Sequence, residues 1–484
     1  MKYVTEGYEP RDVLRFFEDI SRIPRGSNNE YEVGHYVYNW GKDLGLDAYI
    51  DEANNVILKK PGSKGCEDLP PVVLQGHLDI VAEKLPESTH DFLKDPLPLY
   101  VEDGILRSRG TTLGADNGNA IAYMMGVLSR NGLVHPPLEC IFTTGEEIGL
   151  VGANKLDRSK FDGMRMINMD GGGMDQTVFT VSAAGGNETR MYQPAQWQDA
   201  KGEFISIELS GMLGGHSAGY NSLTRGNAVK ILARMLYHVS DYTKFTIAKM
   251  DGGSKMNAIP SSITAVIGVD DRATALAELN KIATAVKEEL RVKDPGFVCN
   301  IAVCNAPEKT LTELQSKRLV QFLLALPHGI RDMNPEIEGA ILNSNNLAAV
   351  HVYDDRLFVW CMNRANDDTR QDRMDEEIRA VADAFGFSVE IGSHFYGWKY
   401  EPESKMRRLH KKLFKKVFDI DLKEESAHGG LETGVFYSKK PGMDIITMGP
   451  KSDGAHTPNE MLVLESFKEM FDYLCLFLEE LTKE

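Results

Sequence analysis

The chain has 484 residues, and its 54 Lys and Arg against 71 Asp and Glu give a formal net charge of −17. This length exceeds what one hydrophobic core usually supports, so two or more domains are expected. A surface this acidic argues against nucleic acid or an anionic membrane as a partner.

The six cysteines are scattered without a CxxC pair, so the sequence predicts neither a disulfide framework nor a thiolate metal site. The N-terminal segment lacks the apolar core of a signal peptide. No uncharged apolar run reaches the roughly 18 residues that would suggest a membrane span. These features together predict a protein of the reducing cytoplasm.

The first part of the chain alternates short apolar runs with helical patterns. Apolar residues recur at helical spacing over 10–22, after a proline that suits a first turn, and again over 119–132. Buried strands are predicted at 72–81, 138–144 and 164–170. Strands that alternate with helices predict an α/β layer with a largely parallel sheet.

The pattern changes after the glycine-rich stretch at 182–188. Residues 204–211 alternate polar and apolar side chains, as in a sheet with one solvated face, and a helical pattern follows at 225–239. A strand, an Arg-Ala pair and a helix occur in succession within 261–290 and again within 347–386. This similarity predicts two α+β repeats within one inserted domain.

The α/β pattern resumes near residue 395, with a helix at 404–418, a strand at 444–450 and a last helix at 463–482 that carries one apolar face. The simplest architecture has two domains. One is discontinuous and comprises 1–185 and 396–484, and the other, 186–395, interrupts it.

Side chains able to bind metal follow several of the predicted strands or precede a helix. Ligands of open α/β sheets bind beyond the carboxyl ends of the strands, so these side chains are expected to meet at one edge of the sheet. They are His77, Asp116, Glu146, Glu147, Asp170 and His456.

Each of these residues also has an ordinary structural explanation. Asp116 suits a helix N-cap, Asp170 a tight turn before three glycines, and His456 an exposed loop. Taken together, two imidazoles and three of these four carboxylates are a sensible ligand set for two divalent cations.

A two-metal hydrolase requires further groups around such ligands. Two ions about 3.5–4 Å apart share a bridging carboxylate, polarise the bond to be cleaved and activate water. A carboxylate that binds no metal must then move a proton, and adjacent glutamates suit this division of roles. A ligand histidine needs an orienting partner, and Asp79 lies on the same strand face as His77 if the strand continues.

These segments resemble the cocatalytic zinc peptidases, the family that includes carboxypeptidase G, aminoacylase and the dipeptidases. The motifs HLD, ADNG, TGEE, MDGG and AHTP occur in that order along most of the chain. Within the family, IPRGSNNE, RSRGTTLGADNG, GGHSAGY and HGGLETG are most similar to bacterial cytosolic aminoacyl-histidine dipeptidases. The resemblance implies a mostly parallel α/β catalytic domain with an inserted α+β lid.

The resemblance also implies roles for the candidate residues. His77 and Asp170 are expected to hold one cation, Glu147 and His456 the other, and Asp116 to bridge them. Glu146 is expected to be the general base and acid, with Asp79 orienting His77. A cis peptide is expected at Asp116–Asn117.

In the lid, the resemblance implies that His216 stabilises the tetrahedral oxyanion and that Asn257 contacts the substrate. Arg364 is the expected clamp for the substrate carboxylate, because arginine binds a carboxylate with two parallel hydrogen bonds. Arg272 is the alternative clamp, and an exposed strand end is the other explanation of Arg364. Glu432, in a glycine-rich loop, is a candidate for contact with the substrate ammonium.

The function expected is hydrolysis of dipeptides such as β-alanyl-histidine. The alternatives are an N-acyl amino acid deacylase, a tripeptidase, or a metal-binding protein without activity, which the presence of Glu146 disfavours. Zn²⁺ is the expected cation, although Mn²⁺ or Co²⁺ suits the same ligands. A small peptide is the expected partner, without nucleic acid or membrane, and the protein is expected to be a monomer or a homodimer.

Overall fold

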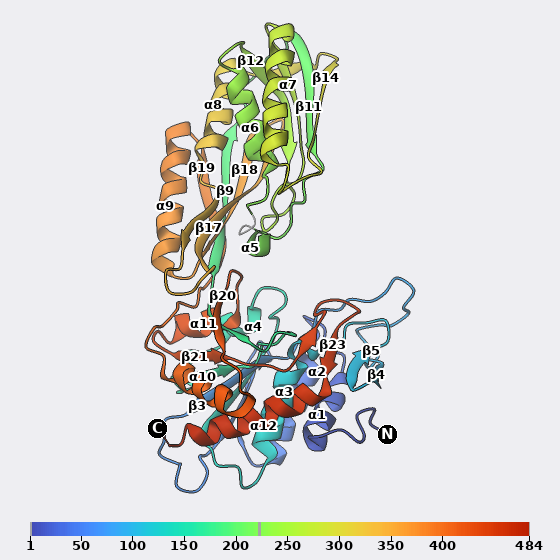
Figure 1. The fold of residues 1–484 in the computed structure, drawn as a ribbon, viewed down its shortest axis with the longest axis vertical. Coiled ribbons are helices and arrows are strands. Elements are labelled where there is room, and N and C mark those ends of the chain that lie inside the picture. Colours follow the sequence, from blue (N-terminus) through green and yellow to red (C-terminus); the bar gives the residue numbers. More distant parts are fainter. Residues whose placement is uncertain (1, 221–223, 484) are drawn as a thin grey trace. The chain divides into compact units, whose positions relative to one another are not determined.

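The computed structural model describes residues 2–220 and 224–483, which divide into two compact units (Figure 1). Unit 1 comprises Met1–Ser182, Tyr400–Ser426 and Leu431–Glu484, and unit 2 comprises Ala183–Lys399 and Ala427–Gly430. The two main divisions lie within a few residues of those expected from the sequence. The return of residues 427–430 to unit 2 is a feature that no sequence pattern indicated.

A six-stranded sheet in the order β1-β2-β6-β3-β7-β21 forms the centre of unit 1. β6, β3, β7 and β21 are parallel, as expected, whereas β2 runs opposite to its neighbours β1 and β6. The reversal follows from a tight turn in which Asp51 accepts hydrogen bonds from the backbone N–H groups of Ala53 and Asn55. The strands are β1 (Asp47–Ile50), β2 (Val56–Lys60), β3 (Val72–His77), β6 (Leu138–Thr143), β7 (Arg165–Asn168) and β21 (Asp444–Thr447).

The helix α3 (Ala115–Ser129) packs on β3 and is in turn covered by α1 (Arg11–Ser21) and α12 (Leu464–Glu480). Beyond Asn119, α3 is buried on nearly all sides, which explains the almost uniformly apolar sequence of residues 120–128. Gly76 allows this close packing, because a Cβ there would lie 2.2 Å from the Cβ of Ala120. The helix can therefore begin directly beside the carboxyl end of β3.

The remaining elements of unit 1 surround this core. The helices are α2 (Tyr31–Asp43), α4 (Val151–Lys155), a 3-10 turn (Arg158–Lys160), α10 (Lys405–Phe418) and α11 (Glu432–Lys439). A four-stranded sheet contains β22 (Ser452–Asp453), β23 (Met461–Val463), β5 (Ile105–Ser108) and β4 (Leu99–Glu102), and β8 (Val178–Ala183) pairs with β20 (Lys423–Ala427).

Unit 2 contains a nine-stranded antiparallel sheet in which two halves share one topology. The strands follow the order β14-β11-β13-β12-β17-β18-β9-β19, with β16 beside β17. The first half contains, in sequence, a strand, a helix, two strands, a helix and a strand (β11, α6, β12, β13, α7, β14). The second half has the same arrangement from β9, α8, β17, β18, α9 and β19, but β9 precedes the first half in the chain and β16 follows α8. The halves join where β12 pairs with β17. The two repeats expected from the Arg-Ala segments are therefore confirmed.

Helices α7, α6, α8 and α9 pack side by side in this order over the sheet of unit 2 (Figure 1). The unit has its own apolar core between these layers. In chain order the unit begins with β9 (Gly185–Pro194), β10 (Trp197–Asp199), β11 (Glu203–Ser210), α5 (Ser217–Tyr220), α6 (Ala228–Val239), β12 (Phe245–Gly252), β13 (Ile263–Val269), α7 (Arg272–Glu289) and β14 (Val298–Cys304). The remainder comprises β15 (Lys309–Leu311), α8 (Glu313–Ala325), β16 (Gly329–Met333), β17 (Ile341–Val352), β18 (Arg356–Ala365), α9 (Asp368–Phe385) and β19 (Ser388–Phe395). Across residues 2–220 and 224–483, no helix has the length and apolar character needed to cross a membrane.

Candidate metal centre

The carboxyl end of β3 places His77 at the edge of the central sheet. The imidazole is almost completely buried, and its Nε2 lies 3.0 Å from Oδ1 of Asp116 and 3.6 Å from Oδ1 of Asp170. β3 ends at His77 rather than continuing, so Asp79 does not share a strand face with it. Nδ1 of His77 nevertheless lies 3.0 Å from the backbone oxygen of Asp79 and 3.5 Å from its Oδ1.

Asp116 lies between two histidines. Its Oδ1 faces Nε2 of His77, and its Oδ2 lies 3.2 Å from Nε2 of His456. The peptide bond between Asp116 and Asn117 is cis, as the family resemblance implies. One oxygen toward each imidazole is the arrangement that a bridging carboxylate requires.

The loop after β6 brings both adjacent glutamates to the same place. Oε1 of Glu147 lies 2.9 Å from Nε2 of His456. The backbone N–H groups of Glu146 and Glu147 donate to Oδ1 and Oδ2 of Asp79, at 3.0 and 3.3 Å. Asp79 therefore holds the glutamate loop as well as contacting His77, a role that its spacing in the sequence did not reveal.

Asp170 completes the group from the loop after β7. Its Oδ1 accepts a hydrogen bond from Nδ2 of Asn117 at 3.2 Å. The backbone oxygen of Met169 accepts a second one from the same amide at 3.0 Å. The residue after the cis bond thus ties the Asp170 loop to the start of α3.

The crowding of carboxylates makes this region favourable for cations. Burial and the charge of Asp116 raise the pKa of Asp170 to about 6, and burial raises the pKa of Glu146 well above its usual value. Hydrogen bonds to Asp116 and Glu147 raise the pKa of His456 to about 10. Burial and neighbouring carboxylates both disfavour negative charge on Asp170 and Glu146, and bound cations would offset that cost.

The geometry fits two cation subsites. Ligand atoms of His77, Asp116 and Asp170 lie within 4.8 Å of one another, as do those of Asp116, Glu147 and His456. Asp116 belongs to both groups. A third group of the same compactness contains His77, Glu146 and Glu147, so Glu146 lies beside the ligands. The donor set of imidazole and carboxylate suits borderline to hard divalent ions.

The site opens to a cavity of about 290 Å³. Asp116, Asn119 and Asp170 line it, together with the backbone of Gly171–Gly173 and the segment 452–455. A small substrate can therefore approach the two aspartates from one side.

Glu432, at the start of α11, lies deeper than expected. It has no exposed surface and accepts hydrogen bonds from Nε2 of Gln75 at 2.5 Å and Oγ1 of Thr143 at 2.7 Å. Burial raises its pKa to about 7. Its contact with a substrate ammonium stays a prediction, and the described contacts join it to β3 and β6.

Within unit 2, the structure brings His216 and Asn257 together. The backbone N–H of Ser217 donates to the oxygen of Asn257 at 2.7 Å, and His216 pairs with Ala258 in an isolated bridge. His216 is exposed, and partial burial together with the charge of Arg364 lowers its pKa. The positive charge that acts on His216 therefore comes from the candidate carboxylate clamp.

The two candidate clamps differ sharply in their surroundings. Arg364 is 4% exposed, its guanidinium lies 5.8 Å from the ring centroid of Phe395, and its Nε has no hydrogen-bond partner among the described residues. Arg272 lies at the surface, 3.0 Å from Oε1 of Glu203. Within residues 2–220 and 224–483 no carboxylate forms an ion pair with the buried Arg364 guanidinium, which is therefore suited to receive an anion, whereas Arg272 already pairs with Glu203.

Sequence patterns missed His428, which lies beside these groups in unit 2. Its Nε2 lies 2.7 Å from Oγ of Ser344, and burial, with the nearby charge of Arg364, lowers its pKa to about 3. HGGLETG was recognisable as a glycine-rich motif, but nothing in it indicated that residues 427–430 join unit 2.

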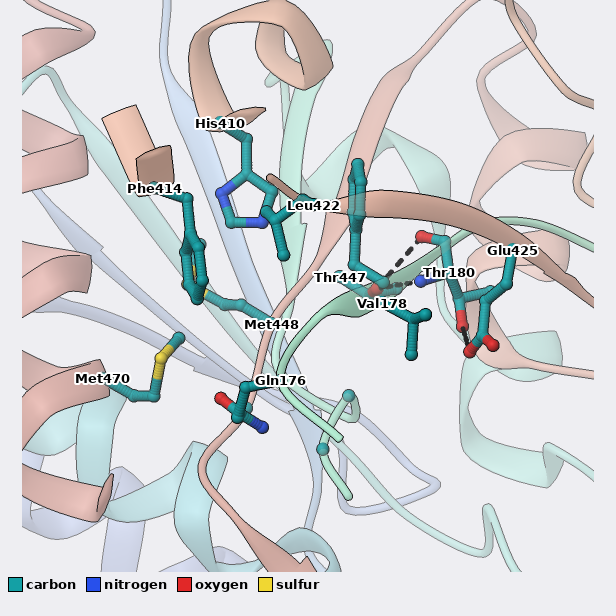
Figure 2. A pocket seen from close by; sticks show the side chains of 14 residues that line it. Gln176, Val178, Thr180, His410, Phe414, Leu422, Glu425, Thr447, Met448 and Met470 are labelled. Carbon is teal, nitrogen blue, oxygen red and sulfur yellow. Dashed lines mark hydrogen bonds between the residues drawn. The ribbon is translucent and has the colours of Figure 1, made fainter. Parts of the chain in front are cut away.

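A second, smaller cavity of about 50 Å³ lies in unit 1 and shares Gly171 and Gly172 with the first. His410, Phe414 and Gln176 face it, and Thr447 is hydrogen-bonded to Thr180 at its wall (Figure 2). This volume holds a few water molecules rather than a peptide.

Comparison with known proteins gives consistent results. The profile described as "Peptidase family M20/M25/M40" matches residues 73–480. The "Cytosol non-specific dipeptidase" of Escherichia coli (strain K12) is 29% identical over 476 residues, which cover 98% of either chain. The crystal structure of an aminoacylhistidine dipeptidase from Vibrio alginolyticus is 26% identical, with a TM-score of 0.93 over 99% of this chain and 98% of that one. The aminopeptidase PepT of Bacillus cereus is 16% identical, with a TM-score of 0.56 over 98% and 99% of the two chains, which is a likeness of fold.

Proposed function

Because the chain belongs to peptidase family M20/M25/M40, a class of hydrolases acting on peptide bonds, we propose that it cleaves dipeptides with two divalent cations bound at the edge of the central sheet. The observation that carries this proposal is Asp116, whose two carboxylate oxygens face two different histidines. The relatives named as dipeptidases support the substrate class.

In this proposal His77 and Asp170 would hold one cation and Glu147 and His456 the other, with Asp116 contributing one carboxylate oxygen toward each group. When bound, the two cations polarise the scissile carbonyl and activate water. Zn²⁺ is the proposed ion, and Mn²⁺ or Co²⁺ suits the same ligands.

Glu146 is the proposed proton carrier. Its carboxylate lies beside the ligand atoms of His77 and Glu147. Burial raises its pKa well above the usual value, which suits a group that takes a proton from water and passes it to the leaving amine. Asp79 positions Glu146 for this proton transfer, because it accepts hydrogen bonds from the backbone N–H groups of Glu146 and Glu147.

Unit 2 supplies the proposed substrate contacts. His216 stabilises the oxyanion, Asn257 adds a polar contact, and Arg364 binds the free carboxylate. The buried state of Arg364 supports this choice over Arg272. The preference for Xaa-His dipeptides rests on the name of the Vibrio alginolyticus relative, and a cytosolic location rests on the name of the Escherichia coli relative.

The first test is hydrolysis of a peptide panel by cation-loaded protein. The panel contains β-alanyl-histidine, other Xaa-His dipeptides, dipeptides without histidine, tripeptides and N-acetyl amino acids. Glu146→Ala should retain both cations and lower kcat by about 10²–10⁴-fold, as expected for loss of a general acid-base. Glu87→Ala, an exposed site outside the centre, is the matched control.

Cleavage of N-acetyl amino acids with free dipeptides inert would favour a deacylase, and cleavage of tripeptides alone a tripeptidase. A Glu146→Ala variant as active as the control would remove Glu146 from the reaction. A wild-type protein that binds no cation and cleaves nothing would refute the two-metal proposal.

A further inference from the structure

A buried arginine outside the ligand set connects the segments that carry the ligands. Arg25 is 1% exposed and lies in the loop between α1 and α2. Its Nη1 donates to the backbone oxygen of Leu78 at 2.8 Å, and its Nη2 donates to that of Gly114 at 2.7 Å. Leu78 follows His77, and Gly114 precedes Asp116 by two residues. The guanidinium therefore joins the end of β3 to the loop of the bridging carboxylate.

The glycines of the TLGADNG segment make room for this guanidinium. A Cβ on Gly114 would lie 2.8 Å from Nη2 of Arg25, and one on Gly118 would lie 2.7 Å from the same atom. Gly114 also has a φ of 71°, a left-handed backbone conformation that favours glycine whatever its neighbours. Gly118 does not have a φ in this region, so the reason for glycine there is space. The glycines on either side of Asp116 therefore leave the space that the Arg25 guanidinium occupies.

Two other residues near Arg25, in the segment between α1 and α2, form hydrogen bonds with Asp79 and with the loop that carries Glu146. Oγ of Ser27 donates to Oδ2 of Asp79 at 2.8 Å, and Oε1 of Glu30 accepts from the backbone N–H of Gly145 at 3.0 Å. The loop also pairs with the chain beyond β3, since Gly26 forms a parallel bridge with Ile80. Every one of these contacts ends on a segment that carries a proposed ligand or Glu146.

The Asp116 loop is held from its other side by Glu460. This buried carboxylate accepts the backbone N–H groups of Leu113 and Gly114 at 2.8 and 2.9 Å, and that of Asp116 at 3.1 Å. Arg25 binds a carbonyl of the loop while Glu460 binds its amides. The backbone before Asp116 therefore has little freedom to move relative to β3.

We propose that Arg25 is a positioning residue that sets the separation of the two cation subsites by clamping the end of β3 to the loop before Asp116. This inference rests on the proposed function, since it concerns the same centre. The hydrogen bonds of Arg25 go to the backbone oxygens of Leu78 and Gly114, so it acts through the backbone on both sides of the shared carboxylate.

The test uses Arg25→Lys in the full chain, because lysine retains the charge but replaces two coplanar nitrogens by one. Co²⁺ serves as the probe, with binding measured by titration and coordination by the visible absorption spectrum. Mutation of a residue that supports metal ligands typically lowers metal affinity or activity by about 10–100-fold. The Kd of the second Co²⁺ should therefore rise by about 10–100-fold in Arg25→Lys. We expect kcat for the dipeptide to fall within the same range, with KM unchanged.

Two further variants separate positioning from general stability. Gly118→Ala places a methyl group against Nη2 of Arg25 and should weaken the second Co²⁺ and alter the spectrum in the same way. Arg22→Lys, on the partly exposed end of the preceding helix, should match the wild type in both measurements. Unfolding curves for each variant report stability separately.

Wild-type Co²⁺ affinity and spectrum in both Arg25→Lys and Gly118→Ala would overturn the proposal, as would a lower unfolding midpoint alone. If Arg25→Lys fails to fold, Gly118→Ala decides. If the wild type binds two Co²⁺ ions but cleaves no dipeptide, the proposed function fails while affinity and spectrum still test Arg25. If the wild type binds none, both are refuted.

Discussion

Single side chains in this protein act on several segments at once. Asp79 contacts His77 and accepts hydrogen bonds from the backbone N–H groups of Glu146 and Glu147, and its burial without exposed surface excludes competition from water. Sequence spacing suggested only the first of these contacts. The same side chain therefore couples the histidine of one strand to the glutamates of the next.

At the residue scale, Arg364→Lys should raise KM for dipeptides by about 10–100-fold with a smaller change in kcat, because the planar fork that receives a carboxylate is lost. Dipeptide amides, which lack the free carboxylate, should show little difference between the two proteins. Arg272→Lys is the matched control and should leave KM unchanged. An equal effect on acids and amides would count against carboxylate binding by Arg364.

His410 gives a prediction about pH. Burial lowers its pKa from 6.5 to about 3, so between these values only the unfolded chain binds the proton. Stability contributed by the neutral imidazole is therefore complete above about pH 6.5 and falls as the pH decreases toward 3, by about 1 kcal/mol at pH 5.5.

The variant His410→Phe should lose less stability between pH 7.5 and pH 5.5 than the wild type does. The ring would remain among Phe179, Phe414 and Phe477, and the hydroxyl of Tyr473 keeps the backbone oxygen of residue 410 as its acceptor. Urea unfolding of the full chain, followed by a signal from unit 1, measures the change in free energy of unfolding between the two pH values. Identical pH dependence in both proteins would assign the titration to other groups.

At the scale of elements, the contact between β3 and α3 positions most of the centre. Gly76 precedes His77, and a Cβ there would lie 2.2 Å from Cβ of Ala120 and 2.3 Å from Oδ1 of Asn117. That oxygen also accepts the backbone N–H of His77 at 3.2 Å. Strand and helix are therefore fitted to each other at the point where the ligands begin.

Gly76→Ala should accordingly reduce the free energy of unfolding by about 1–3 kcal/mol and weaken cation binding, because the added methyl separates β3 from α3. Ala120→Gly in the same chain should recover part of the loss. Gly429→Ala, where a Cβ would meet nothing within 4 Å, serves as the control in thermal unfolding. A Gly76→Ala protein as stable as the control would show that α3 can move away from β3 with little loss in the free energy of unfolding.

At the scale of the whole molecule, every proposed cation ligand belongs to unit 1. Cation binding should stabilise that unit by about 3 kcal/mol at a free concentration 100 times the Kd, with little direct effect on unit 2. Hydrogen exchange of the full chain, with and without chelator, resolves the two units.

Removal of the cation should lower protection in peptides that span 72–79, 113–118 and 144–147. Peptides from β11 to β13 in unit 2 should exchange at the same rate in both conditions. Uniform loss of protection across the chain would contradict ligation confined to unit 1.

The sequence by itself determined the α/β alternation, the position of the inserted unit to within a few residues, and the identity of the side chains that gather around Asp116. These features are local: strand ends, helix periodicity and polar residues placed directly after buried strands are all legible along the chain. The repeat in unit 2 was visible for the same reason, because the strand, Arg-Ala pair and helix of each copy follow one another directly in sequence.

Only the tertiary structure decided which distant residues hold this arrangement in place. The antiparallel β2, the burial of Arg364, the return of 427–430 to unit 2 and the clamp formed by Arg25 each depend on segments that approach one another after folding. A guanidinium and a backbone carbonyl 89 positions apart leave no periodic signal in a sequence. The physical reason is that hydrogen bonds and burial are properties of neighbours in space, and a one-dimensional pattern records only neighbours along the chain.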